Sequence, residues 1–144
     1  MTGPEKTDTV FDPSPLLETL QVSVSTEGLA QALTHSSFAY ENGGDDNERL
    51  EFLGDAVLGQ SITAALYRHF PELAEGELAK RRASIVSTTA LADVARTISL
   101  GDFLRLGRGE EITGGRDKPS LLADALEALI GVVFLELGPE AATG

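Results

Sequence analysis

The 144-residue sequence predicts an all-α protein that forms a single domain. Apolar residues recur at helical spacing, as they do from Leu91 through Val94 and Ala95 to Ile98. No segment shows the strict alternation of apolar and polar residues that is typical of a half-buried strand. A chain of this length can bury one hydrophobic core, so one domain is expected.

The first half of the chain predicts a polar tail followed by three helices. Residues 1–13 read as a disordered tail, which leaves 14–144 as the domain. Ser14 and Pro15 are a cap and a first helical residue, and they lead into a helix over 16–20. A short helix is expected over 27–33. The loop 43–47 precedes a long helix that runs to about residue 69, where Pro71 ends it. Asn47 is interpreted as the cap of that helix.

The second half predicts three more helices and one long loop. A helix over 77–86 is followed by Ser87 or Thr88, either of which can cap a helix over 90–98. Residues 101–119 are rich in glycine and read as a loop with about one turn of helix. The last helix contains Asp124 and is expected to end at Gly138.

The long helix carries three carboxylates among apolar residues. At about 100° per residue, Glu48, Glu51 and Asp55 fall within roughly 60° of one another, on one stripe. A buried unpaired charge is among the costliest features a fold can contain, so this cluster requires cations.

The last helix repeats this pattern. Asp124 and Glu127 lie three residues apart on one face of an otherwise apolar run. If the two helices pack together, their carboxylates converge. Oxygen ligands in a chain without cysteine suit Mg²⁺ or Mn²⁺. The alternative is that these acids face solvent, as most helical acids do.

Residues 47–58, NERLEFLGDAVL, resemble the signature of the ribonuclease III family, whose members cleave double-stranded RNA. The resemblance extends over residues 16–138. Other segments match the family in its order and spacing: Ala32–His35 with Tyr40–Gly44, Glu75–Lys80, Leu106–Glu111 and Leu122–Ala128. The resemblance implies the family's helical endonuclease domain. It also implies a closing helix after Pro139, apparently truncated here, and for many members a double-stranded-RNA-binding domain, which is absent. We therefore expect a fragment.

The resemblance also implies roles for individual acids. Glu51, Asp55, Asp124 and Glu127 match the family's metal ligands, and Mg²⁺ is the expected ion, with Mn²⁺ as a substitute. Asp55 and Glu127 are expected to be catalytic, together with Glu48 and Glu75. The implied reaction is hydrolysis of double-stranded RNA to 5′-phosphate and 3′-hydroxyl ends, in processing of rRNA and mRNA. Without the resemblance, Glu48 and Glu75 could equally be acids that complement a helix start.

Phe52 has two readings. Its position beside the acids in an apolar helix favours core packing. The resemblance instead implies a homodimer in which this aromatic side chain fills a socket on the partner subunit.

The charge distribution is compatible with RNA as a partner, although the net charge is −12. Eight of the eleven Lys and Arg residues lie within 80–118, against five acids in that window. RNA contact is expected for Lys80, Arg81, Arg82 and Arg108. The alternative for the three on one helix is a solvated face.

Two other classes of protein compete with the enzyme. A di-iron carboxylate bundle would need Glu-x-x-His pairs, whereas Glu48 and Asp124 are each followed at i+3 by glutamate. A non-catalytic member of the same fold, which binds RNA or a ribonucleoprotein, would be expected to have lost metal ligands. The polar N-terminus and the short apolar run from Leu121 predict a cytoplasmic protein without a membrane span.

Overall fold

The computed structural model describes residues 11–20 and 22–138, and these residues confirm the all-α prediction. No named strand occurs among them; the one isolated β-bridge joins Thr34 and Arg105. The elements are α2 (Ser14–Leu20), α3 (Thr26–Ala32), α4 (Ser36–Asn42), α5 (Glu48–His69), α6 (Glu75–Ile85), α7 (Thr88–Thr97), the 3₁₀ turn η1 (Leu100–Phe103), α8 (Arg108–Ile112), the 3₁₀ turn η2 (Gly115–Asp117) and α9 (Pro119–Leu137).

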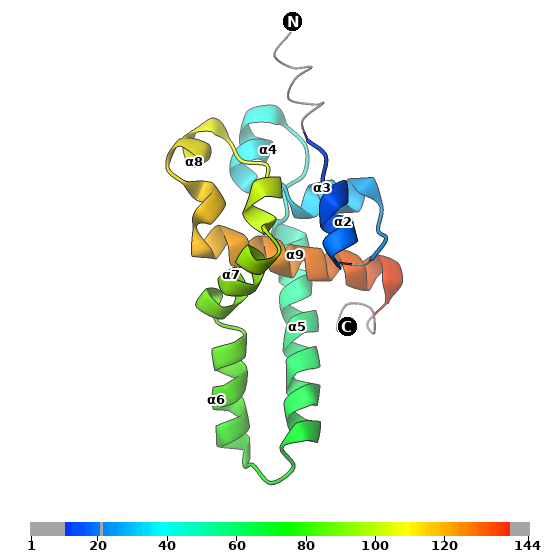
Figure 1. Ribbon diagram of the computed structural model, residues 1–144, viewed down its shortest axis with the longest axis vertical. Coiled ribbons are helices and arrows are strands. Elements are labelled where there is room, and N and C mark those ends of the chain that lie inside the picture. Colours follow the sequence, from blue (N-terminus) through cyan, green and yellow to red (C-terminus); the bar gives the residue numbers. More distant parts are fainter. Residues whose placement is uncertain (1–10, 21, 139–144) are drawn as a thin grey trace, which may run out of the picture.

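The two longest helices, α5 and α9, cross at the centre of the molecule (Figure 1). Helix α9 is apolar around most of its circumference and buries ten residues, because α5 packs on one side of it and α7 on another. Helices α3 and α7 complete the core, to which each contributes fully buried residues such as Ala32 and Ala92. Burial of this apolar surface is the main stabilising term for the fold.

The lower half of α5 leaves this core and forms an antiparallel hairpin with α6 (Figure 1). Helix α6 contains no buried residue, so it is held to the molecule far less firmly than α9. Its first residue lies at the tip of the hairpin, away from the crossing of α5 and α9.

Several predicted helix ends are confirmed. Helix α5 ends at His69, two residues before Pro71. Ser87 is the cap of α7, because its hydroxyl accepts a hydrogen bond from the backbone N–H of Ala90. Helix α9 ends at Leu137, and Gly138 follows with φ of 92°, a conformation that favours glycine.

Three expectations about local structure were wrong in whole or in part. Helix α4 was not predicted; His35 begins it by accepting the N–H of Ser37 on Nδ1. Asn47 occupies the N-cap position of α5, as predicted, but its side chain makes no capping bond. That side chain is buried and donates to the carbonyl of Ala32, while Asp46 accepts the N–H of Glu48. The loop over 101–119 contains two 3₁₀ turns and α8, not a single turn.

The packed part of the chain begins before residue 14. Pro13 is buried, and the Arg105 guanidinium lies 4.7 Å from the centre of the Phe11 ring. The rest of the predicted tail, residues 1–10, and the segment 139–144 lie outside the described residues. Within the described part, no helix is long and apolar enough to cross a bilayer.

Candidate metal centre

Two glycines allow α5 and α9 to touch backbone to backbone. A Cβ atom on Gly54 would lie 1.6 Å from the carbonyl oxygen of Glu127, and one on Gly131 would lie 2.5 Å from that of Leu50. Any larger residue at either position would force the helices apart. This close approach brings the acid stripe of α5 against that of α9.

Three carboxylates converge at the crossing. One oxygen from each of Glu51, Asp124 and Glu127 lies within 4.8 Å of the other two. Glu127 is the most enclosed of the three, with 7% of its surface exposed. Glu51 and Asp124 are half-buried and lie closer to solvent. The arrangement is a cluster of carboxylate oxygens in which one acid is buried and two are partly exposed.

The acids repel one another and are poorly hydrated. Burial, followed by the neighbouring Asp124 carboxylate, raises the pKa of Glu51 to about 7. Burial and then a hydrogen bond with Asp55 raise the pKa of Glu127 to about 8. Both shifts mean that the site lacks positive charge. At neutral pH it holds a proton that a cation could displace.

No ion pair among the described residues involves these acids. The four pairs that form involve Arg96, Arg116 and Lys118, all of them on other faces. The only ligands at the crossing are carboxylate oxygens, which are what Mg²⁺ and Mn²⁺ prefer. The residues therefore fit a hard divalent cation, because it would neutralise charge that nothing else in the described chain compensates.

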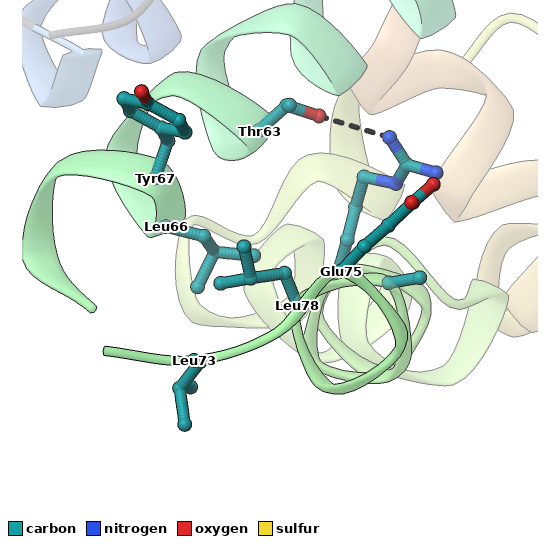
Figure 2. A pocket seen from close by; sticks show the side chains of 8 residues that line it. Thr63, Leu66, Tyr67, Leu73, Glu75 and Leu78 are labelled. Atoms are coloured by element: carbon teal, nitrogen blue, oxygen red, sulfur yellow. Dashed lines mark hydrogen bonds between the residues drawn. The ribbon is translucent and has the colours of Figure 1, made fainter. Parts of the chain in front are cut away.

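The other predicted site acids occupy different places. Asp55 is exposed and is not one of the three converging acids, although its carboxylate contributes to the raised pKa of Glu127. The charge of Glu48 adds to the raised pKa of Glu51. Glu75 is not brought to this site. It is exposed at the start of α6, where it lines a separate cavity of about 450 Å³ with Leu66 and Leu78 (Figure 2).

The basic residues do not all project freely into solvent. All four predicted residues, Lys80, Arg81, Arg82 and Arg108, are exposed, but two of them contact other side chains. The Arg81 guanidinium lies 4.6 Å from the centre of the Phe70 ring, and Arg82 donates a hydrogen bond to the hydroxyl of Thr63 at 3.1 Å. These two arginines therefore already have partners inside the α5–α6 hairpin.

Phe52 is not a core residue, since 82% of its surface is exposed. It borders a cavity of about 640 Å³ that is also lined by Gln31, Leu53 and Leu135. Leu135 is itself exposed by 63%. An aromatic side chain and a mainly apolar hollow, which Glu48 and Arg49 also line, therefore lie side by side on this face.

Gly54 and Gly131 are functional positions that the sequence analysis missed. A signal was present, because a glycine in a helix interior costs up to about 1 kcal/mol relative to alanine and needs a compensating reason. Here the reason is the helix crossing that forms the site.

An all-helical domain with carboxylates converging from two crossed helices defines a candidate metal-dependent hydrolase centre. The family model described as ribonuclease-III-like matches residues 26–144. The chain belongs to this ribonuclease-III-like family, as the sequence predicted.

Individual relatives agree with this assignment. The chain is 61% identical over 133 residues to "Ribonuclease 3" of Leifsonia xyli subsp. xyli, an alignment that covers 92% of this chain and 56% of that protein. It is 60% identical over 127 residues to "Ribonuclease 3" of Thermobifida fusca, covering 88% and 53%. The chain thus spans about half the length of these relatives.

The solved structures confirm the fold. A nuclease domain of ribonuclease III from Campylobacter jejuni superimposes with a TM-score of 0.87 at 43% identity, and the match covers 92% of this chain and 91% of that one. That structure is described as showing flexibility in a region involved in dimer formation. A second structure of the same domain gives a TM-score of 0.85 at 44% identity over 90% and 87% of the two chains.

Proposed function

We propose that the chain is the catalytic domain of a double-stranded-RNA-specific endoribonuclease that depends on Mg²⁺. The observation that carries this proposal is the convergence of Glu51, Asp124 and Glu127, none of which forms an ion pair with a Lys or Arg among the described residues. A module that only binds RNA would not need a buried glutamate with a raised pKa at its centre.

In this proposal Glu51, Asp124 and Glu127 hold the ion, and Asp55 completes the set from the rim. When bound, Mg²⁺ acidifies water to supply the nucleophile and stabilises charge on the leaving 3′ oxygen. Glu127 is fixed by the helix crossing and therefore sets the position of the site within the molecule. Glu48 lies on the same stripe of α5 and keeps the approach to the site acidic.

The proposed substrate is duplex RNA, and the products are 5′-phosphate and 3′-hydroxyl ends formed during rRNA and mRNA processing in the cytoplasm. A-form RNA is recognised mainly through its shape, phosphates and 2′-hydroxyls. Lys80 and Arg108 are exposed, and we propose them for phosphate contact. Double-stranded DNA of the same length should therefore be a poor substrate.

The proposed partner is a second copy of the chain. In a two-fold interface the same surface of each subunit faces the other. Phe52 of one copy would then enter the hollow of the second copy, and the reverse. Such a dimer would present two acid centres to one RNA duplex.

The test is a gel of long double-stranded RNA incubated with the protein, with Mg²⁺, with Mn²⁺ and with EDTA, next to double-stranded DNA of equal length. We expect cleavage of RNA only, in either metal, and none in EDTA. Full activity in EDTA, or equal cleavage of DNA, would exclude the mechanism. Binding of RNA without any cleavage in either metal would favour the non-catalytic alternative.

A further inference from the structure

One face of α6 is turned toward α5. The cavity between the two helices is lined from α6 by Glu75, Leu78, Ala79 and Arg82, spaced at i, i+3, i+4 and i+7. At about 100° per residue these four positions share one stripe of the helix. Arg82 therefore belongs to the inner face of α6.

Lys80 lies on another side of the same helix. Its position is about 140° around the axis from that of Glu75, whereas the position of Arg82 is within about 20°. Two neighbouring cations on one helix thus have different surroundings. Both side chains are exposed, but Arg82 lines the cavity between α5 and α6, whereas Lys80 does not.

The side chain of Arg82 joins the two helices. Its Nη1 donates to the Thr63 hydroxyl of α5 at 3.1 Å, the bond marked by the dashed line in Figure 2. Since α6 buries no residue completely, few interactions fix its spacing from α5. A single directional bond between the helices therefore has a larger share in that spacing than it would have in the core.

We propose that Arg82 is a positioning residue, which holds α6 on α5 through Thr63, and not an RNA-phosphate contact. This inference rests on the proposed function, because the α6 that it positions carries Lys80, the residue that we propose for phosphate contact. Without this bond α6 moves relative to α5. The protein then still binds RNA but cuts it more slowly.

The first experiment measures cleavage by Arg82→Met, Thr63→Val and the double variant at saturating double-stranded RNA. Met keeps the apolar stem of the arginine, and Val keeps the shape of the threonine. We expect each single change to slow cleavage about threefold to tenfold, as loss of one such bond would. The double variant should be no slower than the singles, because all three lack the same bond. Thr63→Ser keeps the hydroxyl, so its cleavage rate should equal that of the wild type.

The second experiment compares RNA affinity at several salt concentrations with Ca²⁺ in place of Mg²⁺. Removal of a phosphate contact lowers the salt slope by about 0.7–0.9. We expect that loss for Lys80→Gln and not for Arg82→Met or Thr63→Val. Thr89→Val, at an exposed threonine of α7, controls for the substitution itself and should match the wild type.

The third experiment is independent of catalysis. The chain has no cysteine, so spin labels on Gln60→Cys and Ala83→Cys report only the distance between α5 and α6. The distribution should broaden with Thr63→Val or Arg82→Met and stay narrow with Lys80→Gln. It remains informative even if the proposed nuclease activity is absent.

The proposal is overturned if Thr63→Val leaves both the distance and the cleavage rate unchanged. It is also overturned if Arg82→Met lowers the salt slope as Lys80→Gln does, which would make Arg82 a phosphate contact.

Discussion

Glu127 has two properties that fit the metal-binding role that we propose for it. It is the buried member of the cluster, and its neighbours repel its charge. Removing that charge should therefore relieve strain in the metal-free protein and at the same time remove a ligand.

We predict that Glu127→Gln leaves the metal-free protein at least as stable as the wild type, while cleavage in Mg²⁺ falls by several orders of magnitude. Glutamine keeps the size and one carbonyl oxygen but loses the charge that attracts the ion. Thermal melting without metal, RNA retention in Ca²⁺ and turnover in Mg²⁺ should be measured on one preparation. If the variant cuts RNA at the wild-type rate, or melts far earlier without metal, Glu127 is a structural acid.

The raised pKa values also predict a pH dependence of stability. The folded state binds protons at Glu51 and Glu127 more tightly than the unfolded chain does, since the pKa rises from 4.5 to about 7 and about 8. The metal-free protein should therefore lose stability as pH rises through that window, with the loss complete above about 8.

Metal-free melting temperatures at pH 5, 6, 7 and 8 check this prediction. They should fall steadily for the wild type and less for Glu127→Gln, which cannot release that proton. Saturating Mg²⁺ should flatten the wild-type curve, because the ion replaces the proton. A wild-type melting temperature that rises with pH over this range would contradict the assignment.

At the scale of helices, the contact between α5 and α9 decides the geometry of the site. The carbonyl oxygen of Glu127 lies where a Cβ on Gly54 would be, so the two helices can cross at this distance only with glycine there. Glu51 and Glu127 lie on the same helical turns of α5 and α9 that form this contact.

We predict that Gly54→Ala destabilises the protein by at least ~1–3 kcal/mol, the usual cost of overpacking a core. The helices must separate to admit the methyl group, so Mg²⁺-dependent stabilisation should be reduced as well. Chemical denaturation with and without Mg²⁺ measures both effects.

Gly59→Ala is the matched control on the same helix. No atom lies within 4 Å of a Cβ at position 59, and alanine favours a helix interior by ~0.5–1 kcal/mol. This variant should be slightly more stable than the wild type, with an unchanged response to Mg²⁺. If Gly54→Ala also leaves the stability and the response to Mg²⁺ undiminished, the close crossing of α5 and α9 does not set the geometry of the acid cluster.

At the scale of the whole molecule, the exposed Phe52 and the hollow beside it form the surface that we propose for a second copy of the chain. The single chain leaves most of this ring in water, so Phe52→Ala should cost it little stability. We predict that the substitution shifts the protein toward monomer in sedimentation while its helical content stays intact.

Tyr67→Ala serves as a control, since that aromatic is 73% exposed but lies on the α5–α6 hairpin. It should leave the sedimentation unchanged. A Phe52→Ala variant that stays a firm dimer, or that unfolds, would contradict the proposed socket.

The sequence by itself determined the fold class and the family, and it predicted the three acids that the structure brings together. The spacing of apolar residues predicts α5, α7 and α9, because a helix that buries one side needs apolar residues every three or four positions. This spacing can be recognised within a short segment of sequence. The stripe of Glu48, Glu51 and Asp55 follows from helical geometry alone. Short elements such as α4 escaped prediction, because caps and contacts with distant residues stabilise them more than any periodic pattern does.

The tertiary structure decided what depends on residues far apart in sequence. It brought Glu51 to Asp124 and Glu127, gave Gly54 and Gly131 their role, and left Phe52 exposed. It also separated Arg82 from Lys80, although both are cations on one short helix. The sequence gives the type of each side chain, but the element that packs against a side chain decides its partner and its exposure. A pattern within a short segment of sequence does not show which element that will be.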